Sequence, residues 1–204
     1  MLEVIILAAG QGSRMQSSLP KVLHTLAGQP LVAHVLQTAR ALRAERIHVV
    51  VGHGAEAVEA TVSAPDVQCH LQAEQLGTGH AVQQAIGACD PASTVLVLFG
   101  DVPLITNEAL QDVVSAADEG IAMLSARLNN PTGYGRVVRD DHGAFVGVVE
   151  EKDATPEQRS VQEINTGVLA AHAEQLSAWL NRVDNRNAQS EYYLPDVLGL
   201  ARED

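Results

Sequence analysis

The 204 residues fit a single domain whose core must be aliphatic, because 46% of them are apolar but only 3% are aromatic. The net charge of −12 argues against nucleic acid as a partner. Apolar runs of about six residues are too short to span a bilayer, and no secretory signal precedes them. We therefore expect a cytoplasmic chain without membrane contact. In that compartment Cys69 and Cys89 would stay reduced.

Residues 1–120 alternate short apolar runs with segments of helical periodicity. Strands are predicted at residues 3–7, 47–51, 67–71 and 94–99. Helices are predicted from Pro30 to residue 42, at residues 56–62 and 78–88, and after Thr106 as N-cap. This alternation predicts βαβ units, a parallel sheet and helices on both of its faces.

The pattern changes after residue 120. Strands are predicted at residues 121–128, 136–139, 145–150 and 163–171. Residues 140–143 are typical of a hairpin turn. Helices are predicted at residues 173–183 and 190–202, the second with Pro195 in its first turn. We expect antiparallel pairs packed on one side of the parallel sheet.

The sequence LAAGQGSR at residues 7–14 forms the end of the first strand and the loop after it. Small residues let backbone N–H groups approach a phosphate closely, and Arg14 and Lys21 could neutralise its oxygens. The glycine spacing matches neither a dinucleotide fingerprint nor a P-loop. A tight turn without any ligand explains the glycines equally well.

Asp101 is separated by one glycine from the strand at residues 94–99. An acid at this edge of a sheet is placed to hold Mg²⁺, which takes few protein carboxylates and keeps water and phosphate oxygens as ligands. The alternative is a turn aspartate that accepts hydrogen bonds from its own backbone.

The sequence QAEQLGTGH at residues 72–80 joins a strand to a helix. Gln72 offers a donor and an acceptor that could read a pyrimidine edge, and Gly77 and Gly79 could bring the backbone close to a base or ribose. Alternatively, Thr78 only caps the helix, and both interpretations can hold together.

Six motifs in this order, the first of them in two parts, resemble those of the sugar-nucleotide pyrophosphorylases. They are LAAGQGSRM (7–15), LPKVLH (19–24), QAEQLGTGHA (72–81), GDVPL (100–104), NPTGYGR (130–136), VEEKDA (149–154) and EINTG (163–167). Within this group, the chain resembles the uridylyltransferase domain of the bacterial bifunctional N-acetylglucosamine-1-phosphate uridylyltransferase/glucosamine-1-phosphate acetyltransferase family. The resemblance covers essentially the whole chain, and implies an α/β, Rossmann-like nucleotidyltransferase fold.

The resemblance also implies an activity: UTP and N-acetylglucosamine 1-phosphate give UDP-N-acetylglucosamine and pyrophosphate, with Mg²⁺. It implies Arg14 and Lys21 as the catalytic pair that neutralises phosphate, and Asp101 as the metal ligand. The substrate-binding residues that it implies are Leu7, Ala8, Ala9, Gly10, Gln72, Gly77, Thr78, Phe99, Gly100, Gly135, Glu150 and Asn165. Residues 1–120 would then bind the nucleotide and residues 121–204 the sugar.

The chain departs from the family pattern at Ser13, Phe99, Ser190 and Pro195, where the family usually has Thr, Tyr, Gly and Thr. The family's second metal ligand, an asparagine, and the acetyltransferase domain that makes its members homotrimeric would lie beyond Asp204. We therefore expect a truncated and monomeric domain. A non-catalytic fragment that binds UDP-N-acetylglucosamine, and a nucleotidyltransferase for another base or sugar, stay open as alternatives.

Overall fold

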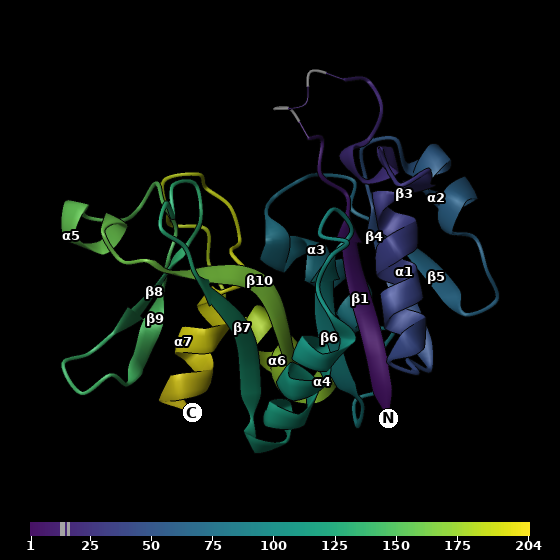
Figure 1. Ribbon diagram of the computed structural model, residues 1–204. Helices are drawn as coiled ribbons and strands as arrows, with labels where there is room; N and C mark the ends of the chain where they lie inside the picture. The colour runs from purple at the N-terminus through teal and green to yellow at the C-terminus, as the bar shows by residue number, and fades with distance from the viewer. Residues whose placement is uncertain (13–14, 16) are drawn as a thin grey trace.

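An eight-stranded mixed sheet runs through the computed structural model, which describes residues 1–12, 15 and 17–204 (Figure 1). Its strand order is β5-β4-β1-β6-β10-β8-β9, and β7 also pairs with β10. The strands are β1 (Leu2–Ala8), β4 (Arg46–Val51), β5 (Val67–Leu71), β6 (Thr94–Phe99), β7 (Ile121–Arg127), β8 (Arg136–Arg139), β9 (Phe145–Val149) and β10 (Glu163–His172). A separate small ladder joins β2 (Thr25–Leu26) to β3 (Gln29–Pro30).

Helices cover both faces of the parallel strands, as predicted. One face packs against α1 (Leu31–Ala41), α2 (Ala55–Val62) and α4 (Asn107–Ala116). The other packs against α3 (Thr78–Ile86), α6 (Ala173–Leu180) and α7 (Asp196–Glu203). Alternate residues of β1 enter the two cores, Val4 and Ile6 on one side and Ile5 and Leu7 on the other, so the strand is apolar throughout. None of the described helices is long and apolar enough to cross a membrane.

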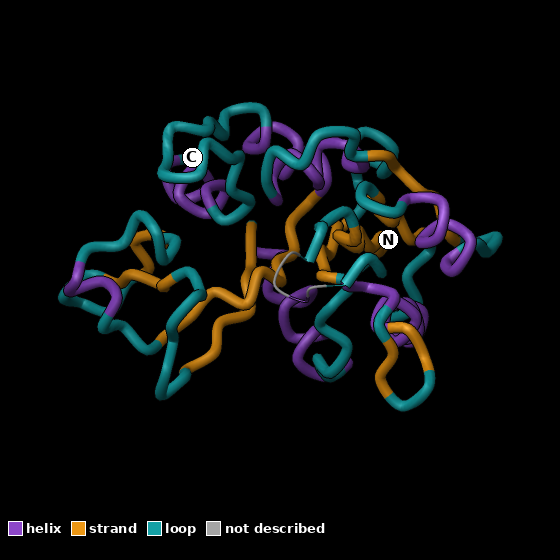
Figure 2. The backbone as a smooth tube through the Cα atoms, turned by 90° about the horizontal axis from the view of Figure 1, so that it is seen from above, coloured by secondary structure: helices purple, strands orange, loops and turns teal. Residues whose placement is uncertain are grey.

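The antiparallel strands extend the sheet at its edge. Strand β10 runs antiparallel to β6, with Leu169 opposite Val97, and then pairs with β7 and β8. The expectation that these pairs would pack on one side of the parallel sheet is therefore wrong. Seen from above, the β8–β9 hairpin and α5 (Pro156–Arg159) project from the rest of the chain, to which β7 and β10 join them (Figure 2).

Most predicted elements form within one to three residues of their expected ends. The side chain of Thr106 caps α4 by accepting a hydrogen bond from the Ala109 N–H (3.3 Å). The helix predicted at residues 190–202 is wrong at its start, because α7 begins at Asp196 and Pro195 precedes it as N-cap. Tyr192 cannot be helical, since its backbone N–H and C=O bond to Leu76 and Gly79 (2.8 Å each). Short 3₁₀ turns, η2 (Lys21–Leu23) and η3 (Ala117–Glu119), complete the fold.

A buried ionic group joins the amino-terminal ends of β1 and β4. The Glu3 carboxylate accepts hydrogen bonds from His48 Nε2–H and the Asp90 N–H (2.8 Å each). The side chains of Glu3 and His48 are at most 1% exposed. Burial by itself would raise the pKa of Glu3, but the bonds from His48, Asp90 and Ser93 hold this pKa below its usual value. His48 Nδ1 also lies 3.0 Å from His70 Nε2. Each carboxylate oxygen of Glu3 therefore has its own hydrogen-bond partner inside the fold.

Replacing Glu3 by alanine should lower the free energy of unfolding by about 3 kcal/mol, because His48 and the Asp90 N–H then lose their buried acceptor. Urea unfolding at neutral pH measures this loss. Asp66→Ala is the control, since the Arg40–Asp66 pair is solvent-exposed and should contribute less than about 1 kcal/mol. Equal losses in the two variants would contradict the role given to Glu3.

Candidate active site

Three parallel strands end side by side at one edge of the sheet. In the register of β1, Ala8 lies opposite Val51 of β4 and Leu7 lies opposite Phe99 of β6. The Gly100 N–H donates to Leu7 O (2.9 Å) just beyond this edge. Leu7, Ala8 and Ala9 have buried side chains, so that here only the backbone can meet a ligand, whereas Gly10 is exposed. In open α/β sheets, ligands bind at this carboxyl edge.

Lys21 and Asp101 meet above the same edge. Lys21 begins the turn η2, and its ammonium group forms an ion pair with the Asp101 carboxylate. The chain passes very close to Lys21 at Gly12, where a Cβ atom would lie 2.7 Å from Lys21 Cβ. Arg14, the second predicted phosphate-binding cation, lies outside the described residues. Of the two predicted cations, the structure therefore places Lys21 in contact with Asp101, the predicted metal ligand.

Asp101 has the chemistry of a magnesium ligand. Its side chain is 21% exposed, so its carboxylate can reach a hydrated ion, and oxygen is the ligand that Mg²⁺ prefers. The ion pair between the Lys21 ammonium group and this carboxylate shows that positive charge is favourable beside Asp101. The residues at this edge therefore fit a divalent cation with one protein carboxylate.

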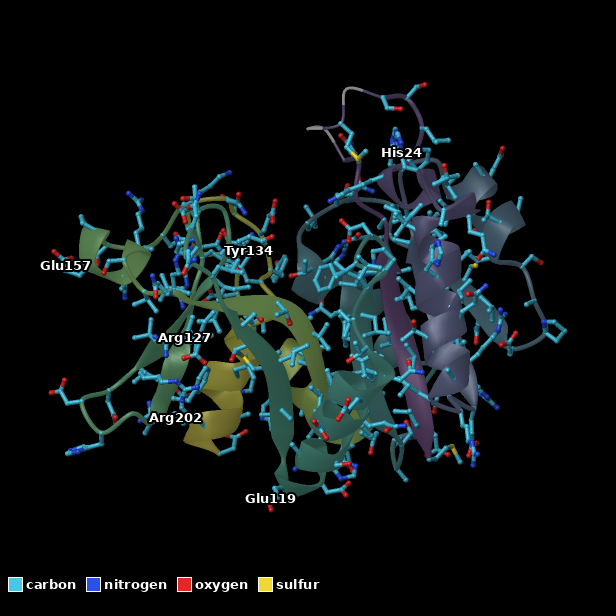
Figure 3. All side chains as sticks on the ribbon, in the orientation of Figure 1. His24, Glu119, Arg127, Tyr134, Glu157 and Arg202 are labelled. Atoms are coloured by element: carbon cyan, nitrogen blue, oxygen red, sulfur yellow. The ribbon has the colours of Figure 1, made fainter. Side chains whose placement is uncertain are left out.

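A cleft with about 620 Å³ of space, open to solvent, lies between the parallel and antiparallel strands. It brings together five of the predicted binding residues: Thr78, Phe99, Gly135, Glu150 and Asn165. Tyr134, which also lines it, lies on the side of the antiparallel part that faces the parallel strands (Figure 3). The remaining described site residues do not line this cleft: Leu7 and Ala8 end β1, and the others lie in the segments that follow β1, β5 and β6.

Backbone contacts arrange the antiparallel wall of the cleft. The Asn165 N–H donates to Gly135 O (2.9 Å), and Asn165 Oδ1 accepts from the Gly167 N–H (2.8 Å). Asn165 lies at a bulge of β10, where the register against β7 shifts before Leu169. Glu150 packs so closely on Gly135 that a Cβ there would lie 2.8 Å from its carboxylate. Gly135, Glu150 and Asn165 therefore form one contiguous polar surface.

Glu150 is held in an unfavourable environment for a charge. Burial raises the pKa of its carboxyl, and the negative charges of Asp196 and Asp153 raise it further, while Arg136 lowers it. When it is ionised, the Glu150 carboxylate can accept hydrogen bonds from the hydroxyl groups of a ligand that enters the cleft.

Gln72 is buried and organises the loop that follows β5. Its Nε2 donates to Gly77 O (3.1 Å) and lies 3.0 Å from His80 Nδ1. Because the Gly77 carbonyl can only accept a hydrogen bond, it orients the amide with its nitrogen toward the loop. Thr78 does not cap α3: Gly77 is the N-cap, and the Thr78 hydroxyl accepts a hydrogen bond from the Leu194 N–H (3.0 Å).

Residues 187–194, here called the connecting segment, link the two walls of the cleft. At one end, Asp153 Oδ1 accepts from the Ala188 N–H (2.9 Å). At the other end, Gly77 and Gly79 lie against Tyr192, where added Cβ atoms would come within 2.6 and 2.9 Å of its carbonyl oxygen. These glycines leave room for the backbone of Tyr192.

Sequence reasoning missed the contribution of this segment, whose Leu194 lines the cleft together with Pro195 and Leu198. One signal was available, because Tyr192 and Tyr193 are two of only three tyrosines in the chain. Aromatic side chains concentrated in the first turn of a predicted helix, here that of residues 190–202, indicate packing against another element.

The model of the MobA-like NTP transferase domain matches residues 4–178. The chain belongs to this family. It is 58% identical over 203 residues to the bifunctional protein GlmU of Burkholderia lata, and 54% identical over 205 residues to that of Cellvibrio japonicus. These matches cover 99% and 100% of the chain but only 45% of each relative, so the chain spans less than half of their length. They confirm the family resemblance drawn from the motifs.

Solved structures confirm the nucleotidyltransferase fold. A UDP-glucose pyrophosphorylase complexed with UDP-glucose superimposes with a TM-score of 0.82 over 99% of this chain and 87% of its own, at 15% identity. A putative glucose-1-phosphate thymidylyltransferase from Bacillus anthracis reaches 0.80 over 100% and 83%, also at 15% identity. With the family membership, the fold identifies this NTP transferase domain as a nucleotidyltransferase.

Replacing Gly77 by alanine should destabilise the NTP transferase domain by about 2 kcal/mol, because alanine is strained at a positive φ and its Cβ would collide with Tyr192. Here φ is 110°. Gly87→Ala at the other end of α3 is the matched control: its φ is −68° and nothing lies within 4 Å, so stability should be unchanged or slightly higher. Urea unfolding of both variants checks this, and similar stabilities would refute the tight packing.

Replacing Glu150 by glutamine should stabilise the ligand-free domain at about pH 8. A group whose pKa is raised by folding contributes stability at low pH that is lost as it ionises, above its ordinary value of 4.5. The gain should therefore shrink toward about pH 4. Urea unfolding across this range measures it, with Glu119→Gln as an exposed control (Figure 3). An unchanged pH profile in Glu150→Gln would contradict the raised pKa.

Proposed function

We propose that the chain is a uridylyltransferase that makes UDP-N-acetylglucosamine and pyrophosphate from UTP and N-acetylglucosamine 1-phosphate, with Mg²⁺. The observation that carries this proposal is the cleft itself. Thr78 and Phe99 reach it from the parallel part, and Gly135, Glu150 and Asn165 reach it from the antiparallel part. A ligand that fills it would contact both walls, as a nucleotide joined to a sugar can.

The orientation of Gln72 favours uracil over cytosine. Because Nε2 bonds to Gly77, Oε1 is the atom that Gln72 can offer to a base, and this oxygen only accepts hydrogen bonds. Position 3 of uracil carries an N–H donor, whereas the same position of cytosine is an acceptor. With the backbone of Leu7, Ala8, Ala9 and Gly10, Gln72 would form the uridine-binding side, in residues 1–120.

The phosphates of a nucleotide bound in this way would extend from the uridine-binding side toward the ammonium group of Lys21 and the carboxylate of Asp101. We assign Arg14 and Lys21 to the triphosphate oxygens, and Asp101, beside Gly100, to Mg²⁺. When bound, Mg²⁺ would neutralise phosphate charge. Glu150 and Asn165, in residues 121–204, would hold the sugar through its hydroxyl and acetamido groups.

The reaction needs positioning more than acid–base chemistry. An oxygen of the sugar phosphate attacks the α-phosphorus of UTP, the new P–O bond forms, the bond to the β-phosphate breaks, and pyrophosphate leaves in line. The attacking oxygen is already anionic, so no side chain has to remove a proton. Lys21 and Arg14 would act by stabilising charge on the transferred group and on pyrophosphate. We further propose that the chain acts as a cytoplasmic monomer.

Pyrophosphate release from UTP, N-acetylglucosamine 1-phosphate and Mg²⁺ tests the proposal, with reactions lacking sugar phosphate or containing CTP as controls. Arg14→Ala and Asp101→Asn should each lower kcat/KM by about 10²-fold or more, because both act on phosphate charge. Asp112→Asn, an exposed acid of α4, should leave it unchanged. Sugar-independent release, or faster release with CTP, would overturn the proposal. Binding of UDP-N-acetylglucosamine without turnover would instead support a non-catalytic fragment.

A further inference from the structure

The loop of residues 133–135 is the part of the antiparallel wall that the other sugar-side groups depend on. Gly133, Tyr134 and Gly135 all line the cleft. Gly135 O receives the Asn165 N–H, and the Glu150 carboxylate rests against Gly135. A displacement of this loop would therefore move Gly135 itself and also Glu150 and Asn165, the two side chains proposed to hold the sugar.

An ion pair behind the cleft holds this loop in place. Arg136 is 1% exposed, and its guanidinium donates to Tyr134 O and, through Nη2, to Glu151 Oε2 (2.6 Å). The same Glu151 oxygen accepts from the Gly133 N–H (3.2 Å). Two successive residues of the loop are thus tied to a single Arg136–Glu151 pair, which does not line the cleft.

Adjacent acids after β9 consequently have different tasks. Glu150 borders the cleft, while Glu151 turns to Arg136 and the backbone of the loop. We propose that Glu151 is a positioning residue that sets the affinity for the sugar part of the ligand, by holding residues 133–135 through Arg136 and the Gly133 N–H. This inference rests on the proposed function, whose sugar-binding wall it completes.

A purely structural ion pair would affect all ligands alike, whereas a positioning residue of the sugar wall affects only those that carry the sugar. Glu151 is the residue to replace, because its side chain is 31% exposed, whereas Arg136 is buried and its replacement would disturb the packing around it. Glu151→Ala removes both contacts. Glu151→Gln keeps an oxygen that can accept from the Gly133 N–H but loses the charge that faces Arg136, so it should have a smaller effect.

Calorimetric titration of the full chain with UDP-N-acetylglucosamine and with UDP tests this inference. Glu151→Ala should raise the Kd for UDP-N-acetylglucosamine about tenfold and change the Kd for UDP by less than about twofold. Amide hydrogen exchange at Gly133 should accelerate in the same variant, because its acceptor is gone. Arg139→Gln is the matched control: it breaks the pair that Arg139 of β8 forms with Glu163 of β10, neither of which lines the cleft, and should change neither Kd.

Each result decides between the two proposals. A wild-type preference for UDP-N-acetylglucosamine over UDP that Glu151→Ala leaves intact, or equal weakening of both ligands, overturns the role of Glu151 and leaves the proposed function standing. A wild-type chain that binds both ligands equally contradicts the proposed sugar site, and the inference fails with it.

Discussion

The parallel register of β1 with β4 and β6 is the constraint on which the arrangement of the site depends. These strands are buried on both faces, so polar groups can reach water only beyond their ends, and parallel strands end on one edge. Strand β10 runs the opposite way, so the residues that begin it arrive at this same edge beside Phe99. One reversal of strand direction thus brings Asn165 opposite the loops that follow β1 and β6.

The two walls of the cleft are also joined at a distance from the sheet. The connecting segment bonds to Leu76 and Gly79 on one side and to Asp153 on the other. Movement of the loop after β5 would therefore displace the connecting segment and, through it, the residues that follow β9. A ligand that touches both walls would meet a surface whose parts are already tied together, which lowers the entropy lost on binding.

Local signals were enough to predict most of the fold. Continuous apolar runs located the parallel strands, and Thr106 and the turn at residues 140–143 marked their elements correctly, because these signals act within a few residues. The start of α7 was mispredicted, since Tyr192 bonds to residues more than a hundred positions away. The same limit hid the Arg136–Glu151 pair and the true neighbours of Gly77. Motifs predicted five of the residues that line the cleft, but only tertiary contacts show what holds them there.

The buried group around Glu3 lies at the opposite end of β1 from the site. At about 3.3 Å per residue, the five positions from Glu3 to Ala8 separate the two by roughly 16 Å. Substitutions at the amino ends of the strands can therefore change resistance to heat or acid without altering the groups that meet a ligand. In such an architecture, adaptation to a new temperature and adaptation to a new substrate can proceed independently, each at its own edge of one sheet.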